Sequence, residues 1–195
     1  MRNVFAIVVG AMVLLPSALW AQQTLTKPDL DVAITYNAQR GVATSGSGFW
    51  AQGEGAELTA NLYRGLGITA DVTGAHTAHV SPSGVGLTLV TATLGPTYTW
   101  SAPAKFRAHK LRIFGQGLIG LASGKDSVFP SPYGVQDKAY SLAAQAGGGV
   151  DMDVSHHIAV RLLQGDWLRT QLPDGASNVE NNLQIGAGVV FRLPK

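Results

Sequence analysis

The sequence predicts an all-β fold, an eight-stranded antiparallel up-and-down transmembrane β-barrel that follows an N-terminal signal peptide. Three observations support this prediction. Apolar and polar residues alternate with period 2 along eight segments of the chain. The connections between these segments tend to alternate between long and short, as in barrels that cross a membrane. Charged residues make up only 13% of the 195 residues, whereas glycine occupies 24 positions.

The composition excludes several classes of protein. The chain has no cysteine, so a disulfide scaffold, a thiolate metal site, a cysteine nucleophile and a lipoprotein anchor are all excluded. A net charge of +2 is too small for a nucleic-acid binder that works by neutralising phosphates. A hydrophobic content of 46% argues against disorder. The length suits one domain.

The first residues have the features of a secretory signal peptide. Arg2 supplies a positive charge, an uncharged and mostly apolar run extends from Val4 to Leu15, and Pro16 ends it. The small residue Ala21 offers a cleavage site before Gln22, which predicts a signal peptide at 1–21 and a barrel domain at 22–195. The alternative is a retained anchor, but the apolar run is much shorter than the about 20 residues that a spanning helix needs.

The predicted strands follow in order along the rest of the chain. In the first, even-numbered residues are mostly apolar and odd-numbered ones mostly polar, and in the last the odd-numbered positions are apolar. The phase shifts near Leu163 and Gln164, which predicts a β-bulge in the seventh strand. The eight predicted strands are 30–38, 55–63, 66–73, 87–100, 110–121, 139–151, 157–169 and 182–193.

The predicted connections are long on one side of the barrel and short or intermediate on the other. The long ones are 39–54, 74–86, 122–138 and 170–181, and the others are 64–65, 101–109 and 152–156. Alternation alone does not say which face points inward, because a soluble up-and-down barrel buries its apolar face. The soluble alternative is a periplasmic barrel that binds a small apolar ligand, and it requires an apolar interior lined by Leu183, Ile185, Val189 and Phe191.

Aromatic residues favour the membrane barrel, since they fall near the ends of the predicted strands. Amphipathic rings are most stable at the depth of the lipid headgroups, so two aromatic girdles are expected. The predicted girdle residues are Tyr36, Trp50, Tyr98, Trp100, Tyr140, Trp167 and Phe191.

The polar faces of the strands then point into the lumen. The predicted lumen charge network consists of Asp31, Glu57, Asp71, Arg112, Arg161, Asp166 and Arg192, with Asp151 beside it. An eight-stranded barrel is just wide enough to be filled by side chains, and buried charges must pair. We therefore expect a salt-bridged plug with Arg112 and Arg161 as central cations and Glu57 and Asp71 among their partners. A gated ion path along the same groups is the alternative.

Several stretches of the chain resemble a known family, and they cover roughly 29–193. They are Tyr63–Asp71, Leu94–Tyr98, Ala146–Asp151, His157–Arg161 with Gln164 and Asp166, and Gly186–Phe191. In this order they resemble the small outer-membrane β-barrel proteins of the OmpA transmembrane-domain and OmpX type. The resemblance implies a monomer in the outer membrane of a Gram-negative bacterium, without catalysis or cofactors and without nucleic acid as a partner. Outer-membrane lipid and lipopolysaccharide are the implied neighbours.

The resemblance also suggests roles for the two ends of the barrel. An envelope structural or surface-interaction role would use the loops around 45–52, 75–85, 123–137 and 172–179. Gln184, Gly186, Val189 and Phe191 have the spacing of the signal read by the barrel-assembly machinery, although Arg192 to Lys195 follow where the family usually ends on an aromatic residue. The chain stops after the last strand, so no peptidoglycan-binding domain is expected.

Three groups of residues are candidates for a catalytic, cofactor-binding or metal site, but none of them predicts such a site. His79 and Ser81 have the His-x-Ser spacing of outer-membrane lipid A deacylases, which makes a lipid A-modifying barrel enzyme the rival function, but no orienting acid is identified. His156 and His157 are adjacent, and neighbouring residues on a strand point to opposite faces. The isolated acids of the third long loop are expected to be solvated.

Overall fold

A computed structural model of the chain describes residues 28–42, 48–80, 85–106, 109–131, 134–173 and 179–193. The signal peptide expected at 1–21 lies outside the described residues, so cleavage after Ala21 stays a prediction. Within the described ranges, no helix is long and apolar enough to cross a membrane.

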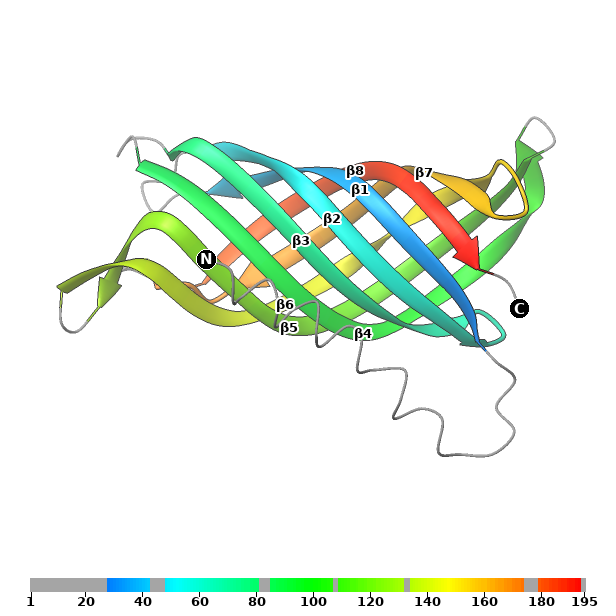
Figure 1. The fold of residues 1–195 in the computed structure, drawn as a ribbon, viewed down its shortest axis with the longest axis horizontal. Helices are drawn as coiled ribbons and strands as arrows, with labels where there is room; N and C mark the ends of the chain where they lie inside the picture. The colour runs from blue at the N-terminus through cyan, green and yellow to red at the C-terminus, as the bar shows by residue number, and fades with distance from the viewer. Residues whose placement is uncertain are drawn as a thin grey trace.

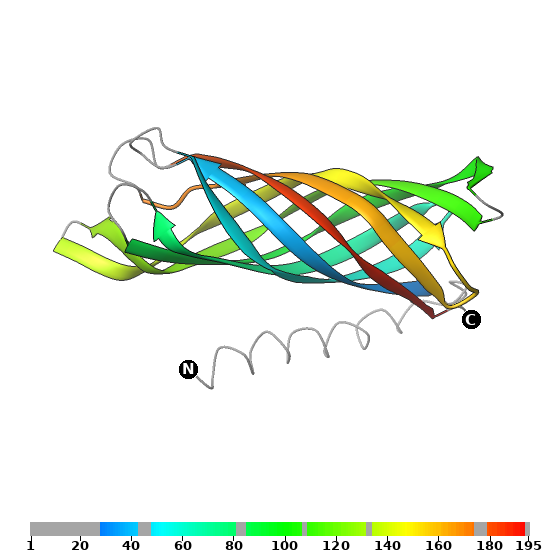
Figure 2. The ribbon, with the colours of Figure 1, turned by 90° about the horizontal axis from the view of Figure 1, so that it is seen from above.

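The described residues form one closed antiparallel β-barrel. Each strand pairs with the next along the chain, and the last returns to pair with the first. The strands are β1 Asp29–Val42, β2 Gly48–Tyr63, β3 Leu66–Val80, β4 Val85–Phe106, β5 His109–Ser131, β6 Gly134–Asp153, β7 Ile158–Thr170 and β8 Glu180–Leu193. Figures 1 and 2 show an elongated barrel with strands inclined to its long axis. The predicted fold class is confirmed.

The two ends of the barrel differ in the strand connections that they carry. Leu30 at the start of β1 pairs with Leu193 at the end of β8. The terminal end is the end that holds this pair and the connections β2–β3, β4–β5 and β6–β7; it lies on the right in Figure 1. The loop end is the opposite one, with the connections β1–β2, β3–β4, β5–β6 and β7–β8.

The strands extend further than the sequence predicts, above all at the loop end. The predicted long loop 122–138 is mostly a hairpin, because β5 continues to Ser131 and β6 begins at Gly134. This hairpin projects beyond the neighbouring strands (Figure 1). The predicted loop lengths are therefore wrong. The β5–β6 register shifts between Lys125 and Phe129, which interrupts the period-2 alternation on which the prediction relies.

Side chains point as a membrane barrel requires. On β8, Leu183, Ile185 and Phe191 are 51%, 42% and 42% exposed. Gln184 and Arg192, on the alternate positions, are 3% and 7% exposed. The soluble alternative placed the apolar set in the interior, and these exposures contradict it. The apolar face of the sheet is the outer surface and the polar face lines the lumen.

A β-bulge in β7 sets the geometry of the lumen. The β7–β8 register shifts between Arg161 and Gln164, which confirms the bulge predicted near Leu163 and Gln164. Leu162 and Leu163 are both exposed on the outer surface. Because two consecutive residues point outward, Arg161 and Gln164 both point inward and are both buried.

The tight turn between β2 and β3 is fixed by its backbone. Arg64 and Gly65 have φ angles of 48° and 87°, the left-handed values that a two-residue hairpin turn needs. The backbone N–H of Thr99 on β4 donates a hydrogen bond to the carbonyl of Gly65 at 2.7 Å. A β-carbon at Gly65 would collide with the carbonyl oxygen of Thr99. The turn therefore docks onto β4 only with glycine at this position.

Candidate functional site: the charged lumen and its terminal cavity

Arg161 is the centre of a buried ionic network. Its Nε donates to Asp151 Oδ1 at 2.9 Å, and its Nη1 donates to Glu57 Oε1 at 3.1 Å and to Gln164 Oε1 at 2.9 Å. The guanidinium carbon also lies 4.2 Å from the centre of the Phe114 ring, a cation–π contact. Arg161 is 3% exposed. One guanidinium thus joins β7 to β6 and to β2 on the opposite wall of the barrel.

The network continues from Arg161 to Asp166 through amides. Gln164 Nε2 donates to Asp166 Oδ2 at 2.8 Å, and Gln116 Nε2 donates to Asp166 Oδ1 at 3.2 Å. Gly147 lies opposite Asp166, and a β-carbon there would occupy the place of the carboxylate. The two amide donors thus satisfy both carboxylate oxygens of Asp166, which is in none of the ion pairs found among the described residues.

Asp71 is placed differently from the prediction. Its Oδ1 accepts a hydrogen bond from Thr73 Oγ1 at 3.0 Å, and none of the ion pairs found in the described lumen includes it. It lies directly opposite Glu57 on the neighbouring strand. The expectation that Asp71 pairs with Arg112 or Arg161 is therefore wrong, whereas the expected pairing of Glu57 with Arg161 is found.

Arg112 and Arg192 form a second ionic cluster at the terminal end. Arg112 Nε lies 3.3 Å from Asp153 Oδ2, and Arg192 Nη1 lies 2.6 Å from Asp153 Oδ1. Asp31 accepts a hydrogen bond from Asn61 Nδ2 at 3.0 Å on the neighbouring strand. The prediction that Arg112 is a central cation is wrong, because Arg112 lies near the start of β5, at the terminal end. Sequence reasoning also missed Asp153, although it follows Asp151 by two residues and so shares its face.

This second cluster borders a cavity of about 750 Å³ at the terminal end. Arg192, Arg112, Lys110 and Asp153 line the cavity from the strands, and Arg64 and His156 line it from the turns. Acids are fewer on its walls: Asp29 and Asp31 lie on the β1 side.

A cluster of apolar side chains lies inside the barrel toward the loop end. Phe129, Leu168 and Leu172 are 6%, 1% and 1% exposed and pack together with Leu89 and three alanines. The lumen therefore has three layers: an apolar plug at the loop end, the Arg161 network in the middle and the open cavity at the terminal end.

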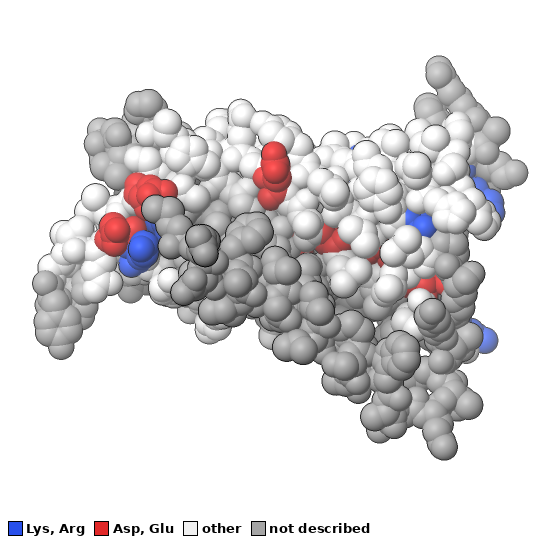
Figure 3. Space-filling view, in the orientation of Figure 1, with Lys and Arg blue, Asp and Glu red and all other residues white. Residues whose placement is uncertain are grey.

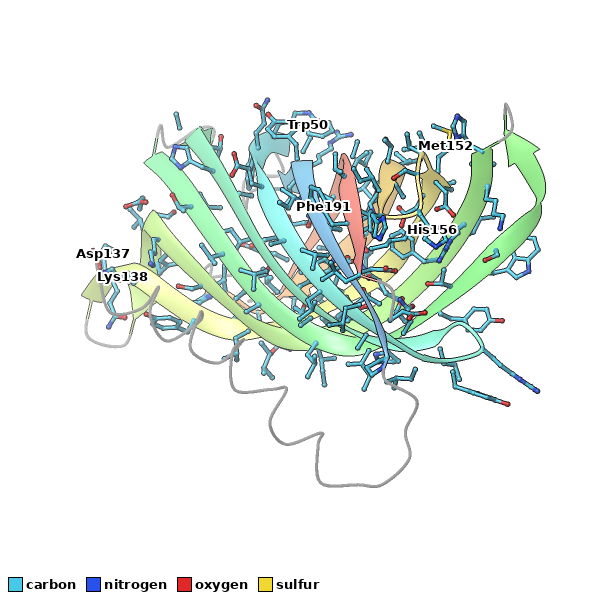
Figure 4. All side chains as sticks on the ribbon, turned by 45° about the vertical axis from the view of Figure 1, so that its right-hand side comes forward. Trp50, Asp137, Lys138, Met152, His156 and Phe191 are labelled. Carbon is cyan, nitrogen blue, oxygen red and sulfur yellow. The ribbon has the colours of Figure 1, made fainter. Side chains whose placement is uncertain are left out.

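The outer surface carries the predicted aromatic residues. Tyr36, Trp50, Tyr140 and Trp167 are exposed toward the loop end, and Tyr98, Trp100 and Phe191 are exposed toward the terminal end. In Figure 3, Lys and Arg side chains lie mainly near the two ends of the visible face. Figure 4 shows Asp137 and Lys138 at the end of the barrel opposite His156. These aromatic side chains thus lie on the outer surface, together with exposed apolar residues such as Ile119, Leu121 and Leu142.

The structure describes only some of the residues that the sequence offers for catalysis or metal binding. Ser81 and the side chain of His79 lie outside the described part. His156 and His157 are exposed in the β6–β7 turn, with their rings edge to face. In the described ranges, no three His, Asp or Glu side chains are arranged to hold a metal ion. Asp126 accepts a hydrogen bond from Thr88 Oγ1 at 2.8 Å.

The fold matches solved outer-membrane proteins, although their sequences differ. Neisserial surface protein A superposes with a TM-score of 0.67 at 12% identity, covering 84% of this chain and 97% of that protein. Ail, the attachment invasion locus protein of Yersinia pestis, crystallised with the heparin analogue sucrose octasulfate, gives 0.57 at 14% identity, covering 86% and 100%. No protein-family model and no curated protein matches the sequence. The chain has the fold of the small eight-stranded transmembrane barrels, as the resemblance to the OmpA and OmpX type implied.

Proposed function

We propose that this chain is a non-enzymatic protein of the outer membrane of a Gram-negative bacterium, exported by a cleaved signal peptide and inserted as a monomer. One observation carries the proposal: the outer surface exposes large apolar side chains such as Ile119, Leu121 and Leu142, while Arg161 and its acids are buried inside. Apolar groups on the outside and charges on the inside are stable only where the surroundings are acyl chains.

The proposed role is envelope structure or surface contact through the loop end. Arg40 and Lys138 are exposed cations that lie on or near this end. They are suited to contact the phosphate groups of lipopolysaccharide, because Lys and Arg bind phosphate strongly. Ail, which shares the fold, was crystallised with a sulfated sugar, and anionic saccharides are the partner class that this comparison supports.

The proposed orientation places the loop end outside the cell, and cysteine labelling tests it. The chain has no cysteine, so Asp137→Cys and His156→Cys each introduce a single thiol at opposite ends. In intact cells, a membrane-impermeant maleimide is expected to label Asp137→Cys and to spare His156→Cys until the outer membrane is permeabilised. Labelling of both variants in intact cells, or recovery of the protein in the soluble periplasmic fraction, would contradict the proposal.

The absence of catalysis is tested on the residues of the rival function. Replacing His79 or Ser81 with alanine is expected to leave the acyl chains of lipid A unchanged, which mass spectrometry of extracted lipid A measures. A change in acylation that follows either substitution would favour the lipid A-modifying enzyme. The proposed assembly signal is tested separately with Phe191→Ser, which is expected to reduce the amount of folded barrel in the outer membrane.

A further inference from the structure

The cavity at the terminal end has the dimensions and the polar walls of a binding site. Its volume of about 750 Å³ falls in the range of about 300–1,000 Å³ that small-molecule sites occupy. The apolar plug of Phe129, Leu168 and Leu172 lies toward the loop end, away from this cavity. Because the cavity is lined by residues of the terminal turns, a ligand can reach it from the terminal end.

The floor of the cavity is short of acceptors. Arg112 and Arg192 share the single carboxylate of Asp153, one on each of its oxygens. Arg192 is 7% exposed; its Nη1 lies 2.6 Å from Asp153 Oδ1, whereas its Nε has no hydrogen-bond partner among the described residues. Buried donors without acceptors are costly, and an oxyanion is the group that satisfies paired guanidinium groups.

The rim of the cavity adds charges of both signs. Arg64 and Lys110 contribute two more cations, whereas Asp29 and Asp31 supply carboxylates on the β1 side. The residues that line the cavity include four cations and three acids. The cations are Arg64, Lys110, Arg112 and Arg192, and the acids are Asp29, Asp31 and Asp153. A ligand with a phosphate group and a nearby ammonium group would match both parts of this wall.

We propose that the terminal cavity binds the phosphate of a phosphoethanolamine-type headgroup, held by Arg112 and Arg192, with the ammonium group toward Asp29 and Asp31. This headgroup occurs in bilayer lipid and in soluble glycerophosphoethanolamine, and both sources present the same chemistry. Tyr98 and Trp100, which are exposed on the outer surface, also line the cavity, so it reaches the side of the barrel where lipid headgroups lie. Binding does not depend on the proposed orientation, which decides only which leaflet supplies the lipid.

Calorimetric titration of the full chain in an uncharged sugar detergent tests the soluble source. Saturable binding of glycerophosphoethanolamine is expected, tighter than that of inorganic phosphate. Loss of one charged hydrogen-bond donor in Arg112→Gln should weaken it by about tenfold or more. Arg169→Gln, the same substitution on the outer surface of β7, is the matched control and should bind as the unmodified chain does.

Lipid binding is tested in nanodiscs of phosphatidylcholine doped with phosphatidylethanolamine. Mass spectrometry of the released barrel is expected to find phosphatidylethanolamine retained by the unmodified chain and by Arg169→Gln, and lost from Arg112→Gln. If Arg112→Gln does not fold, as judged by heat-modifiable gel mobility, the exposed turn variant Arg64→Gln takes its place in both experiments. Retention in nanodiscs without soluble binding identifies the lipid as the source. Absence of binding in both experiments, or equal binding by the Arg112 or Arg64 variant and the control, would overturn the proposal.

Discussion

Replacing Arg161 with methionine removes the guanidinium that joins Glu57 to Asp151. Both carboxylates are buried, and their hydrogen bonds to Arg161 at 2.9 and 3.1 Å would be lost together. Breaking a buried ion pair by removing one partner costs about 3–5 kcal/mol. Loss of the cation–π contact with Phe114 adds about 1 kcal/mol. With a denaturant slope of about 2 kcal/mol per molar urea, the unfolding midpoint should fall by about 2–3 M.

The assay is urea unfolding in lipid vesicles, followed by the fraction of protein that keeps its folded mobility on a gel. Arg169→Met on the outer surface is the control, and its free energy of unfolding should change by less than about 0.5 kcal/mol. Adding Glu57→Gln and Asp151→Asn to Arg161→Met removes the stranded charges and should restore most of the stability. A single variant as stable as the unmodified chain, or a triple variant less stable than the single one, would refute this reasoning.

Two further predictions concern the outer surface and the β2–β3 turn. Ala187→Lys, midway along β8 and exposed on the outer surface, should lower stability in vesicles by about 2–4 kcal/mol, whereas Leu183→Lys near the loop end should cost about 0–1 kcal/mol. Equal effects at the two depths, measured by the same unfolding assay, would argue against a membrane-spanning surface. Gly65→Ala should lower the free energy of unfolding by about 1–2 kcal/mol because residue 65 has a positive φ. It should also slow folding into vesicles, which is measured by gel mobility against time. Gly74→Ala is the control, because a β-carbon there meets no atom within 4 Å.

The fold could be predicted because its main signal is local. Period-2 alternation marks each barrel-spanning segment, and the phase slip in β7 is visible where two leucines, Leu162 and Leu163, interrupt it. The ends of the strands could not be predicted in the same way. In the hairpin 123–138 the register shifts between Lys125 and Phe129, so the alternation is interrupted while the strand pairing continues.

The ion pairs in the lumen were only partly predictable, because they depend on the stagger between strands. The sequence shows that Arg112, Arg161, Glu57 and Asp71 all face inward, but it does not show their depth. Depth depends on the tilt and shear of the closed sheet, which no local pattern encodes. As a result Arg161 meets Glu57 across the lumen, while Arg112 lies at the terminal end and pairs with Asp153.

The alternative to a structural plug is a gated ion path, and the layers of the lumen lie across such a path. A path would have to cross two barriers of different nature, the apolar layer around Phe129 and the ionic layer around Arg161. Removing one barrier leaves the other intact, so neither Phe129→Ala nor Arg161→Met alone should conduct ions in a planar bilayer. The double variant should show single-channel currents, because water can then enter from both ends. Steady conduction by either single variant would show that its remaining barrier is not closed, and would favour the gated path.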